Sequence, residues 1–151
     1  GDINSPFAVL EANIDDMSPE IAAYAIECML SAGALDAWTT PILMKKGRQA
    51  IMLSALVKTA DTTALSTVMF RETTSLGVRI RPSYRTERAR RMISVTTQFG
   101  DIPVKIAEGD GLPQNVAPEF DDCRRAAQQH RVPIKAVFAA ATAAAESLLG
   151  S

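Results

Sequence analysis

The chain has 151 residues, with 16 Lys and Arg against 17 Asp and Glu, so its formal net charge is −1 at pH 7. This balance gives no electrostatic reason to expect nucleic acid or a membrane surface as a partner. No apolar run reaches the roughly 20 residues of a membrane span, and no secretory signal opens the chain, so we expect a cytoplasmic protein. The length allows one domain or two small ones, and residues 1–6 are expected to be a linker or an expression remnant.

The pattern of residues 7–85 predicts six elements of secondary structure. Strand side chains alternate with a period of two, so Leu10 and Ile14 share one face of the first strand and Glu11 lies on the other. The expected elements are a strand at 7–14, a helix at 18–32, strands at 35–44 and 50–57, a helix at 61–72 and a strand at 77–84. This order is typical of a ferredoxin-like βαββαβ unit, whose two helices cover one sheet face. The second face must then meet another domain, another subunit or a ligand.

The two helices of this unit carry recognisable signals. Ser18 suits the N-cap of the first helix, Pro19 suits its first position, and Gly33 suits the position after its end. Asp61 is expected to cap the second helix. The expected buried stripe of the first helix is Ile21, Ala25, Met29 and Ala32.

The pattern changes in residues 86–151, which predict a smaller subdomain. Residues 86–91 are expected to be a charged connector, and two strands at 92–97 and 102–107 to form a hairpin. A loop rich in Gly, Pro and Asn is expected at 108–117, followed by helices at 118–130 and 133–149 that each begin at a proline. The fold class is therefore α+β, a ferredoxin-like unit followed by a hairpin and two helices.

Three carboxylates, those of Asp15, Asp16 and Glu20, lie where the first strand gives way to the first helix. Acids near a helix start are favoured by the helix dipole, and this explains Glu20 without a ligand. Asp15 and Asp16 precede the cap and repel each other unless a cation, a basic side chain or water screens them. Solvated acids at a helix start and a site for a hard cation both remain open. The segment 115–122 repeats this pattern and leaves the same alternatives.

Basic and hydroxyl side chains gather in three other segments. The hairpin tip Lys45-Lys46-Gly47-Arg48 suits phosphates, although solvated tips often carry lysine. Arg71 is followed by Thr73, Thr74 and Ser75, which offer either a phosphate or ribose pocket or plain helix-end chemistry. The arginines between residues 79 and 91 could bind nucleic acid, but aromatic residues hardly interleave them, and a solvated or subunit-facing strand edge is the preferred interpretation.

Several common chemistries have no matching pattern. The chain lacks the G-x-x-x-x-G-K-[ST] and G-x-G-x-x-G phosphate loops, and one histidine, His130, makes a catalytic triad improbable. Cys28 and Cys123 are expected to be buried, reduced thiols, and with His130 they make a poor set for zinc or nickel. On a ferredoxin-like sheet, however, Glu11, Asn13, Asp15, Arg79 and Arg81 could all point away from the helices. Carboxylates beside lysines and arginines are what a metal–nucleotide complex requires.

Five ordered segments resemble one family, the LarC nickel-insertion proteins that complete the nickel-pincer cofactor of lactate racemase. The matching stretches are Asn13–Glu20, Gly33–Asp36, Met44–Arg48, Phe70–Arg79 and Asn115–Arg124. The resemblance implies the C-terminal part of a CTP-dependent nickel insertase (a cyclometallase of the lyase class). Such an enzyme inserts Ni²⁺ into pyridinium-3,5-bisthiocarboxylic acid mononucleotide. It also implies CTP with Mg²⁺ or Mn²⁺ as cofactor, the family's N-terminal domain as partner, and a homo-oligomer (a trimer or a hexamer).

The resemblance also assigns candidate site residues, by motif. Asp15, Asp16 and Glu20 are expected to hold the metal, and Lys45, Lys46 and Arg71 to be catalytic. The expected nucleotide-binding residues are Arg48, Thr73, Thr74, Arg79, Lys105, Glu119 and Asp122. Two other functions stay open: an oligomerisation module whose chemistry lies elsewhere, and a nucleotide sensor that binds without hydrolysis.

Overall fold

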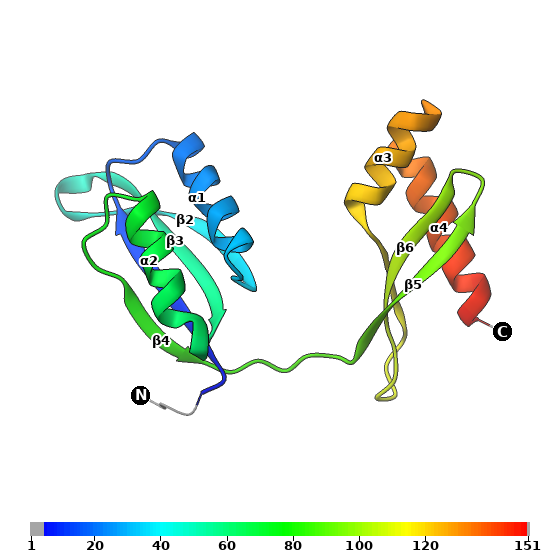
Figure 1. The fold of residues 1–151 in the computed structure, drawn as a ribbon, viewed down its shortest axis with the longest axis horizontal. Coiled ribbons are helices and arrows are strands. Elements are labelled where there is room, and N and C mark those ends of the chain that lie inside the picture. The colour runs from blue at the N-terminus through cyan, green and yellow to red at the C-terminus, as the bar shows by residue number, and fades with distance from the viewer. Residues whose placement is uncertain (1–4, 151) are drawn as a thin grey trace. The chain divides into compact units, whose positions relative to one another are not determined.

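The computed structural model describes residues 5–150, which form two compact units with their boundary after Arg85. Each unit pairs one antiparallel sheet with two helices, so the chain is α+β, as predicted (Figure 1). Of the predicted linker, residues 1–4 lie outside the described residues. Ser5 is buried, and its hydroxyl lies within hydrogen-bond distance of the carbonyl oxygens of Phe7 and Ser83, so this residue belongs to the first unit. Within residues 5–150, no helix has the length and apolar character needed to cross a bilayer.

The first unit has the predicted order of elements. They are β1 (Phe7–Ile14), α1 (Pro19–Ser31), β2 (Asp36–Leu43), β3 (Gln49–Lys58), α2 (Thr62–Glu72) and β4 (Arg79–Ser83). The strands lie in the order β2-β3-β1-β4 with every pair antiparallel, which is the ferredoxin-like arrangement. Strand β1 is central, and its Glu11 lies opposite Ser54 of β3 on one side and Arg79 of β4 on the other.

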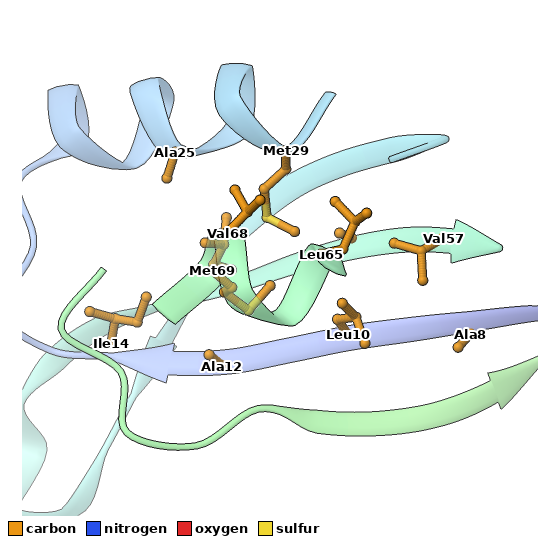
Figure 2. Close-up of a cluster of buried hydrophobic side chains, with 12 residues drawn as sticks. Ala8, Leu10, Ala12, Ile14, Ala25, Met29, Val57, Leu65, Val68 and Met69 are labelled. Atoms are coloured by element: carbon orange, nitrogen blue, oxygen red, sulfur yellow. The ribbon is translucent and has the colours of Figure 1, made fainter. Parts of the chain in front are cut away.

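Both helices of the first unit pack on one face of this sheet. Met29 of α1 and Leu65 and Met69 of α2 are fully buried against Leu10 of β1 (Figure 2). Burying such a side chain stabilises the fold by roughly 1.5–3 kcal/mol. The alternation predicted for β1 is therefore real, and it leaves Glu11 on the face away from the helices.

The ends of α1 and α2 match the predictions in part. The hydroxyl of Ser18 accepts the N–H of Ile21 at 3.3 Å, as an N-cap should. The predicted stripe was wrong at two positions, because Ile21 is 53% exposed and Ala32 is an exposed C-cap, whereas Ala22 is buried. Helical spacing allows the buried side of α1 to run through either Ile21 or Ala22. The orientation of α1 on the sheet buries Ala22, together with Ala25 and Met29. Asp61 occupies the N-cap of α2, but its side chain makes no capping bond there.

The second unit contains β5 (Arg90–Thr97), β6 (Gly100–Ala107), β7 (Asn115–Pro118), α3 (Phe120–His130) and α4 (Ile134–Leu149). Its strands lie in the order β5-β6-β7 and are antiparallel. Ile102, Val104 and Ile106 of β6 are buried with Cys123 of α3 and Val137 of α4. One face of this sheet is thereby covered by both helices.

The prediction of a hairpin with two helices was incomplete in this unit. Part of the expected loop at 108–117 pairs with β6 as β7, whose edge position tolerates the missing N–H of Pro118. Pro118 therefore does not start α3, and Glu119 is its N-cap instead. The connector is also shorter than expected, because Arg90 and Arg91 already pair with β6.

Truncating the core of the first unit should destabilise it strongly. Met29→Ala is expected to lower the free energy of unfolding by about 2–5 kcal/mol, because a cavity replaces a fully buried side chain. Urea denaturation followed by the fluorescence of Trp38, the single tryptophan, would measure the change in this unit. Leu76→Ala is the control, since Leu76 is 99% exposed and should change stability by less than about 0.5 kcal/mol. Equal effects of the two variants would contradict the described core.

Candidate functional site

Polar residues of three segments lie at one end of the first unit, where two contacts join the segments. We call them the strand-end cluster and define it as Asp15, Asp16, Lys45, Lys46, Arg48 and Thr74. Ile14, the last residue of β1, lies opposite Ile51 near the start of β3, so Asp15 follows beside the β2–β3 hairpin. Arg48 Nη1 lies 3.4 Å from Asp15 Oδ2, and the hydroxyl of Thr74 donates to Asp16 Oδ1 at 2.5 Å. Two segments remote in sequence are thus tied to the two adjacent acids.

The hairpin tip holds Lys46 in a strained backbone conformation. Lys45–Gly47 form one 3-10 turn, in which Lys46 has φ 63° and ψ 20° and Gly47 has φ 71°. Glycine adopts this left-handed region freely, whereas a lysine there costs roughly 1–2 kcal/mol. Both lysines are exposed. A non-glycine residue in a strained, exposed turn is a candidate functional position.

A hollow of about 520 Å³ opens beside this cluster. Its volume lies within the range of about 300–1,000 Å³ that is usual for small-molecule sites. Asp15 and Gln49 contribute carboxylate and amide groups to a lining that is otherwise mostly apolar. The lining residues are Ile14, Asp15, Met17, Pro41, Ile42, Leu43, Gln49, Ala50 and Ile51. A flat organic ring could pack on the apolar part, with charged groups of the same ligand beside Asp15 and Arg48.

The three hydroxyls after α2 have different roles. The Thr73 hydroxyl donates to the carbonyl oxygen of Met69 at 2.7 Å and accepts the N–H of Ser75 at 3.1 Å, so it ends the helix. The Ser75 hydroxyl donates to the carbonyl oxygen of Gly77. Only Thr74 reaches an acid of the strand-end cluster. In the last turn of α2, Arg71 pairs with its neighbour Glu72 at 2.9 Å.

Away from the helices, the sheet face carries a buried carboxylate between two arginines. Glu11 is 7% exposed and accepts from Arg81 Nη2 at 3.0 Å and Arg81 Nε at 3.1 Å. Arg79 Nε lies 3.4 Å from the same carboxylate, and Arg79 Nη2 donates to Asn13 at 2.9 Å. The hydrogen bonds from Arg81, followed by its charge and by Arg79, lower the pKa of Glu11 against the opposing effect of burial. Arg79 is thereby held by bonds to Glu11 and to Asn13, which precedes Asp15 by two residues.

Comparison with known proteins decides the family. The family model described as nickel insertion protein matches residues 2–138. This chain belongs to the nickel insertion protein family. A relative from Myxococcus xanthus is 43% identical over 141 residues, which are 93% of this chain and 36% of the relative. The pyridinium-3,5-bisthiocarboxylic acid mononucleotide nickel insertion protein of Thermotoga petrophila is 39% identical over 130 residues, 86% of this chain and 33% of that protein.

A solved structure of the same family has the same fold. It is the apo form of LarC2, the C-terminal domain of a cyclometallase involved in the synthesis of the NPN cofactor of lactate racemase. It is 37% identical with a TM-score of 0.84, over 93% of this chain and 96% of that one. The chain therefore corresponds to the C-terminal domain of a LarC-type nickel insertion protein. It spans about a third of the length of the full-length relatives that it matches.

For a nickel insertion protein, this chain offers few soft ligands. Within residues 5–150, no three His, Cys, Asp or Glu side chains gather as a ready metal site. Cys123 is buried, and burial together with the carboxylates of Asp122 and Glu119 raises the pKa of its thiol. Metals bind the thiolate, so this cysteine is a poor nickel ligand. The carboxylate oxygens of Asp15 and Asp16 are the ligand type that suits a hard cation.

Four other predicted site residues are not members of the strand-end cluster as defined above. Glu20 lies exposed in the first turn of α1. The other three belong to the second unit, where Lys105 Nζ lies 3.9 Å from Glu119 Oε1 and Asp122 pairs with Arg125. They form their own local ion pairs there.

Two site features escaped prediction from the sequence. Glu11 was expected only to share a face with Arg79 and Arg81, whereas it is their common partner. The alternation of side chains in β1 predicted the face on which Glu11 lies. Its pairing with Arg79 and Arg81 depends on the register between β1 and β4. Gln49 lines the hollow and had no sequence signal at all.

The ion pairs of Glu11 should make the stability of the first unit depend on pH. Glu11→Gln is expected to lower the free energy of unfolding by about 1–3 kcal/mol at pH 7, because both arginines lose their charged acceptor. The pKa of Glu11 is lower in the folded than in the unfolded protein. Its contribution is therefore present above the unfolded value, about 4.3, and is lost as the pH falls through the folded pKa. Urea titrations between pH 7 and pH 3, read by Trp38 fluorescence, should converge for wild type and variant.

The matched control for this pH series is Glu27→Gln, on the exposed surface of α1. It should change the free energy of unfolding by less than about 0.5 kcal/mol throughout the range. A destabilisation by Glu11→Gln that is the same at pH 3 as at pH 7 would contradict the assigned role of the carboxylate.

Proposed function

We propose that this chain is the metal–CTP-binding and CTP-hydrolysing domain of an enzyme that inserts nickel into pyridinium-3,5-bisthiocarboxylic acid mononucleotide. The observation that carries the proposal is the pair Asp15–Arg48, at 3.4 Å, on the rim of a hollow of about 520 Å³. A carboxylate and a cation side by side match the two charges of a metal–phosphate complex. Membership of the nickel insertion protein family supports the nickel chemistry.

The strand-end cluster fits a nucleotide with its metal. Asp15 and Asp16 offer hard oxygen ligands for Mg²⁺ or Mn²⁺, which is commonly held by one or two carboxylates and the phosphates of its nucleotide. Lys45 and Lys46 act as point charges toward the phosphates, and Arg48 offers a planar fork. Binding of the metal to Asp15 would release Arg48 for the phosphate chain. Until then, their ion pair keeps the two side chains next to each other.

The same cations would assist hydrolysis. Charge develops on the phosphate oxygens as the phosphoanhydride bond breaks, and Lys45, Lys46 and Arg71 are the groups proposed to stabilise it. Fixed donors lower the barrier because they need no reorganisation during the reaction. The strained turn at Lys46 supports this role, since it sets the backbone position from which this side chain extends.

The nickel step would involve more than this chain. Cys123 is a buried, protonated thiol, and oxygen donors dominate the cluster, so the thiocarboxylates of the mononucleotide and the family's N-terminal region are proposed to carry nickel. The N-terminal region is accordingly a proposed partner. Free Cys28 and Cys123 favour a reducing compartment, and we propose the cytoplasm.

Assembly through the open sheet face is the second candidate function. Trp38 is 37% exposed in the row Trp38–Ser54–Glu11, on the face that no helix covers. Tryptophan beside charged residues is typical of interfaces. A second copy of the chain is the proposed occupant, as one contact within the trimer or hexamer that the family resemblance implies. Light scattering should report only monomers for Trp38→Glu if this face forms the interface, and an unchanged mass would refute it.

A substitution at Lys46 should test the binding of CTP without changing the stability of the fold. Lys46→Asn removes the charge but tolerates the left-handed turn, so it should weaken the binding of CTP with Mn²⁺ at least tenfold without destabilising the protein. Lys46→Arg is the matched control and should keep the affinity within about threefold. Calorimetry gives the affinities and urea denaturation gives the stability. Equal affinity of the Asn variant and wild type would refute the phosphate role.

Hydrolysis is measured separately from binding. Release of phosphate or pyrophosphate from CTP should fall at least tenfold in Lys46→Asn even when the nucleotide is saturating. Binding by wild type without any hydrolysis, also in the presence of the N-terminal region, would instead support a nucleotide sensor.

A further inference from the structure

The segment that enters the first unit is bonded to the strand by which the chain leaves it. Ser5 precedes β1 and is 3% exposed, and the start of β1 lies beside the end of β4 (Figure 1). The N–H of Ser83, the last residue of β4, donates to Ser5 Oγ at 3.1 Å. Ser5 Oγ also lies 2.6 Å from the carbonyl oxygen of Ser83 and 2.7 Å from that of Phe7. One buried serine therefore joins the beginning of the unit to its end.

The entering segment is also held from the other side of β1, at the end of β3. Thr59 follows β3, and its hydroxyl donates to the carbonyl oxygen of Ser5 at 2.5 Å. The N–H of Thr59 donates to the carbonyl oxygen of Pro6 at 3.1 Å. Ser5 and Pro6 are thus bonded to the ends of both strands that flank the central strand.

The last residue of the first unit contacts the same place. Arg85 ends this unit, and its guanidinium lies over the ring of Phe7, 4.7 Å from the ring centroid. An arginine over an aromatic ring is attracted to it electrostatically. The chain therefore leaves the unit across its own entry. We call Ser5, Phe7, Thr59, Ser83 and Arg85 the entry–exit cluster.

Strand β4 has few other attachments. It has five residues, Arg79–Ser83, lies at the edge of the sheet and pairs with β1 alone among the described strands. Its first four residues are exposed, and Pro82 has no N–H for the ladder. Arg79 and Arg81 bond to Glu11 toward one end, and Ser83 is held by Ser5 at the other. A short, exposed edge strand is the kind of element that opens before the core does.

We propose that the entry–exit cluster is a conformational switch. Withdrawal of Ser5 from between the ends of β3 and β4 releases β4 and the connector to the second unit together, while the helix-covered core stays folded. None of the five cluster residues belongs to the hydrophobic core under the two helices, so the cluster opens without exposing that core. The part of the protein that would withdraw Ser5 is the N-terminal region. That choice rests on the proposed function, whereas the switch itself does not.

The test is amide hydrogen exchange of the full chain, resolved by NMR. Ser5→Ala should speed exchange about tenfold at Ser83 and also at the β4 amides that pair with β1, the change expected for one lost hydrogen bond. Amides between β2 and β3 should stay within about twofold of wild type. Thr59→Val removes the bond from the β3 side and should speed the same β4 amides severalfold, which keeps the test valid if Ser5→Ala folds poorly.

The matched control is Thr67→Val, which removes a hydroxyl that donates to the carbonyl oxygen of Thr63 on the exposed side of α2. It should leave exchange in β4 unchanged. Faster exchange confined to the Ser83 amide would make Ser5 only a local hydrogen-bond partner and would overturn the proposal. An equal acceleration between β2 and β3 would indicate opening of the whole unit and would overturn it as well.

Trypsin measures the release of the connector. Cleavage after Arg85 divides the chain into residues 1–85 and 86–151, which mass spectrometry identifies. Ser5→Ala should raise the initial rate of this cut about threefold or more, whereas cuts after Arg90 and Arg91, which pair in β5, should keep the wild-type rate. Equal rates after Arg85 in both proteins would overturn the proposal. Neither measurement contains nucleotide or metal, so its failure leaves the proposed function standing, and failure of Mn²⁺–CTP binding leaves the switch standing.

Discussion

The pairing of β1 with both β3 and β4 is the constraint on which the first unit depends. In a strand paired on both edges, alternate side chains point to opposite faces of the sheet. Here Leu10 and Ile14 point to the face that the helices cover. Glu11 must then lie on the opposite face, where it is buried without helices above it. Arg79 and Arg81 of β4 neutralise it, so the register that builds the core also builds the ion network.

The same strand also delivers the candidate site. Its polar continuation, Asp15 and Asp16, emerges at the sheet end beside the β2–β3 hairpin, where Arg48 meets Asp15. Because β1 and β3 are antiparallel, the end of one strand lies at the start of the other, and no long loop is required. A charged site on the ends of rigid strands is positioned more firmly than one on mobile loops.

Much of the first unit was predictable because its signals are local. Alternation in β1, the Ser18-Pro19 helix start and the order of elements all follow from short-range chemistry. The errors arose where tertiary contacts choose between local options. The stripe of α1 shifted to Ala22, and Asn115–Pro118 became a strand only because β6 offered an edge. The individual acids and cations of the site were visible in the sequence, but their pairing, such as Thr74 with Asp16, depends on the fold.

A crystal structure of the chain with CTP and Mn²⁺, using the anomalous signal of manganese, tests the central claim most directly. The account predicts manganese within about 2.5 Å of a carboxylate oxygen of Asp15 or Asp16, with the phosphates beside Lys45, Lys46 and Arg48. The ion pair between Arg48 and Asp15 should be broken in that structure. Manganese and triphosphate bound away from the strand-end cluster, with that ion pair intact, would contradict the account.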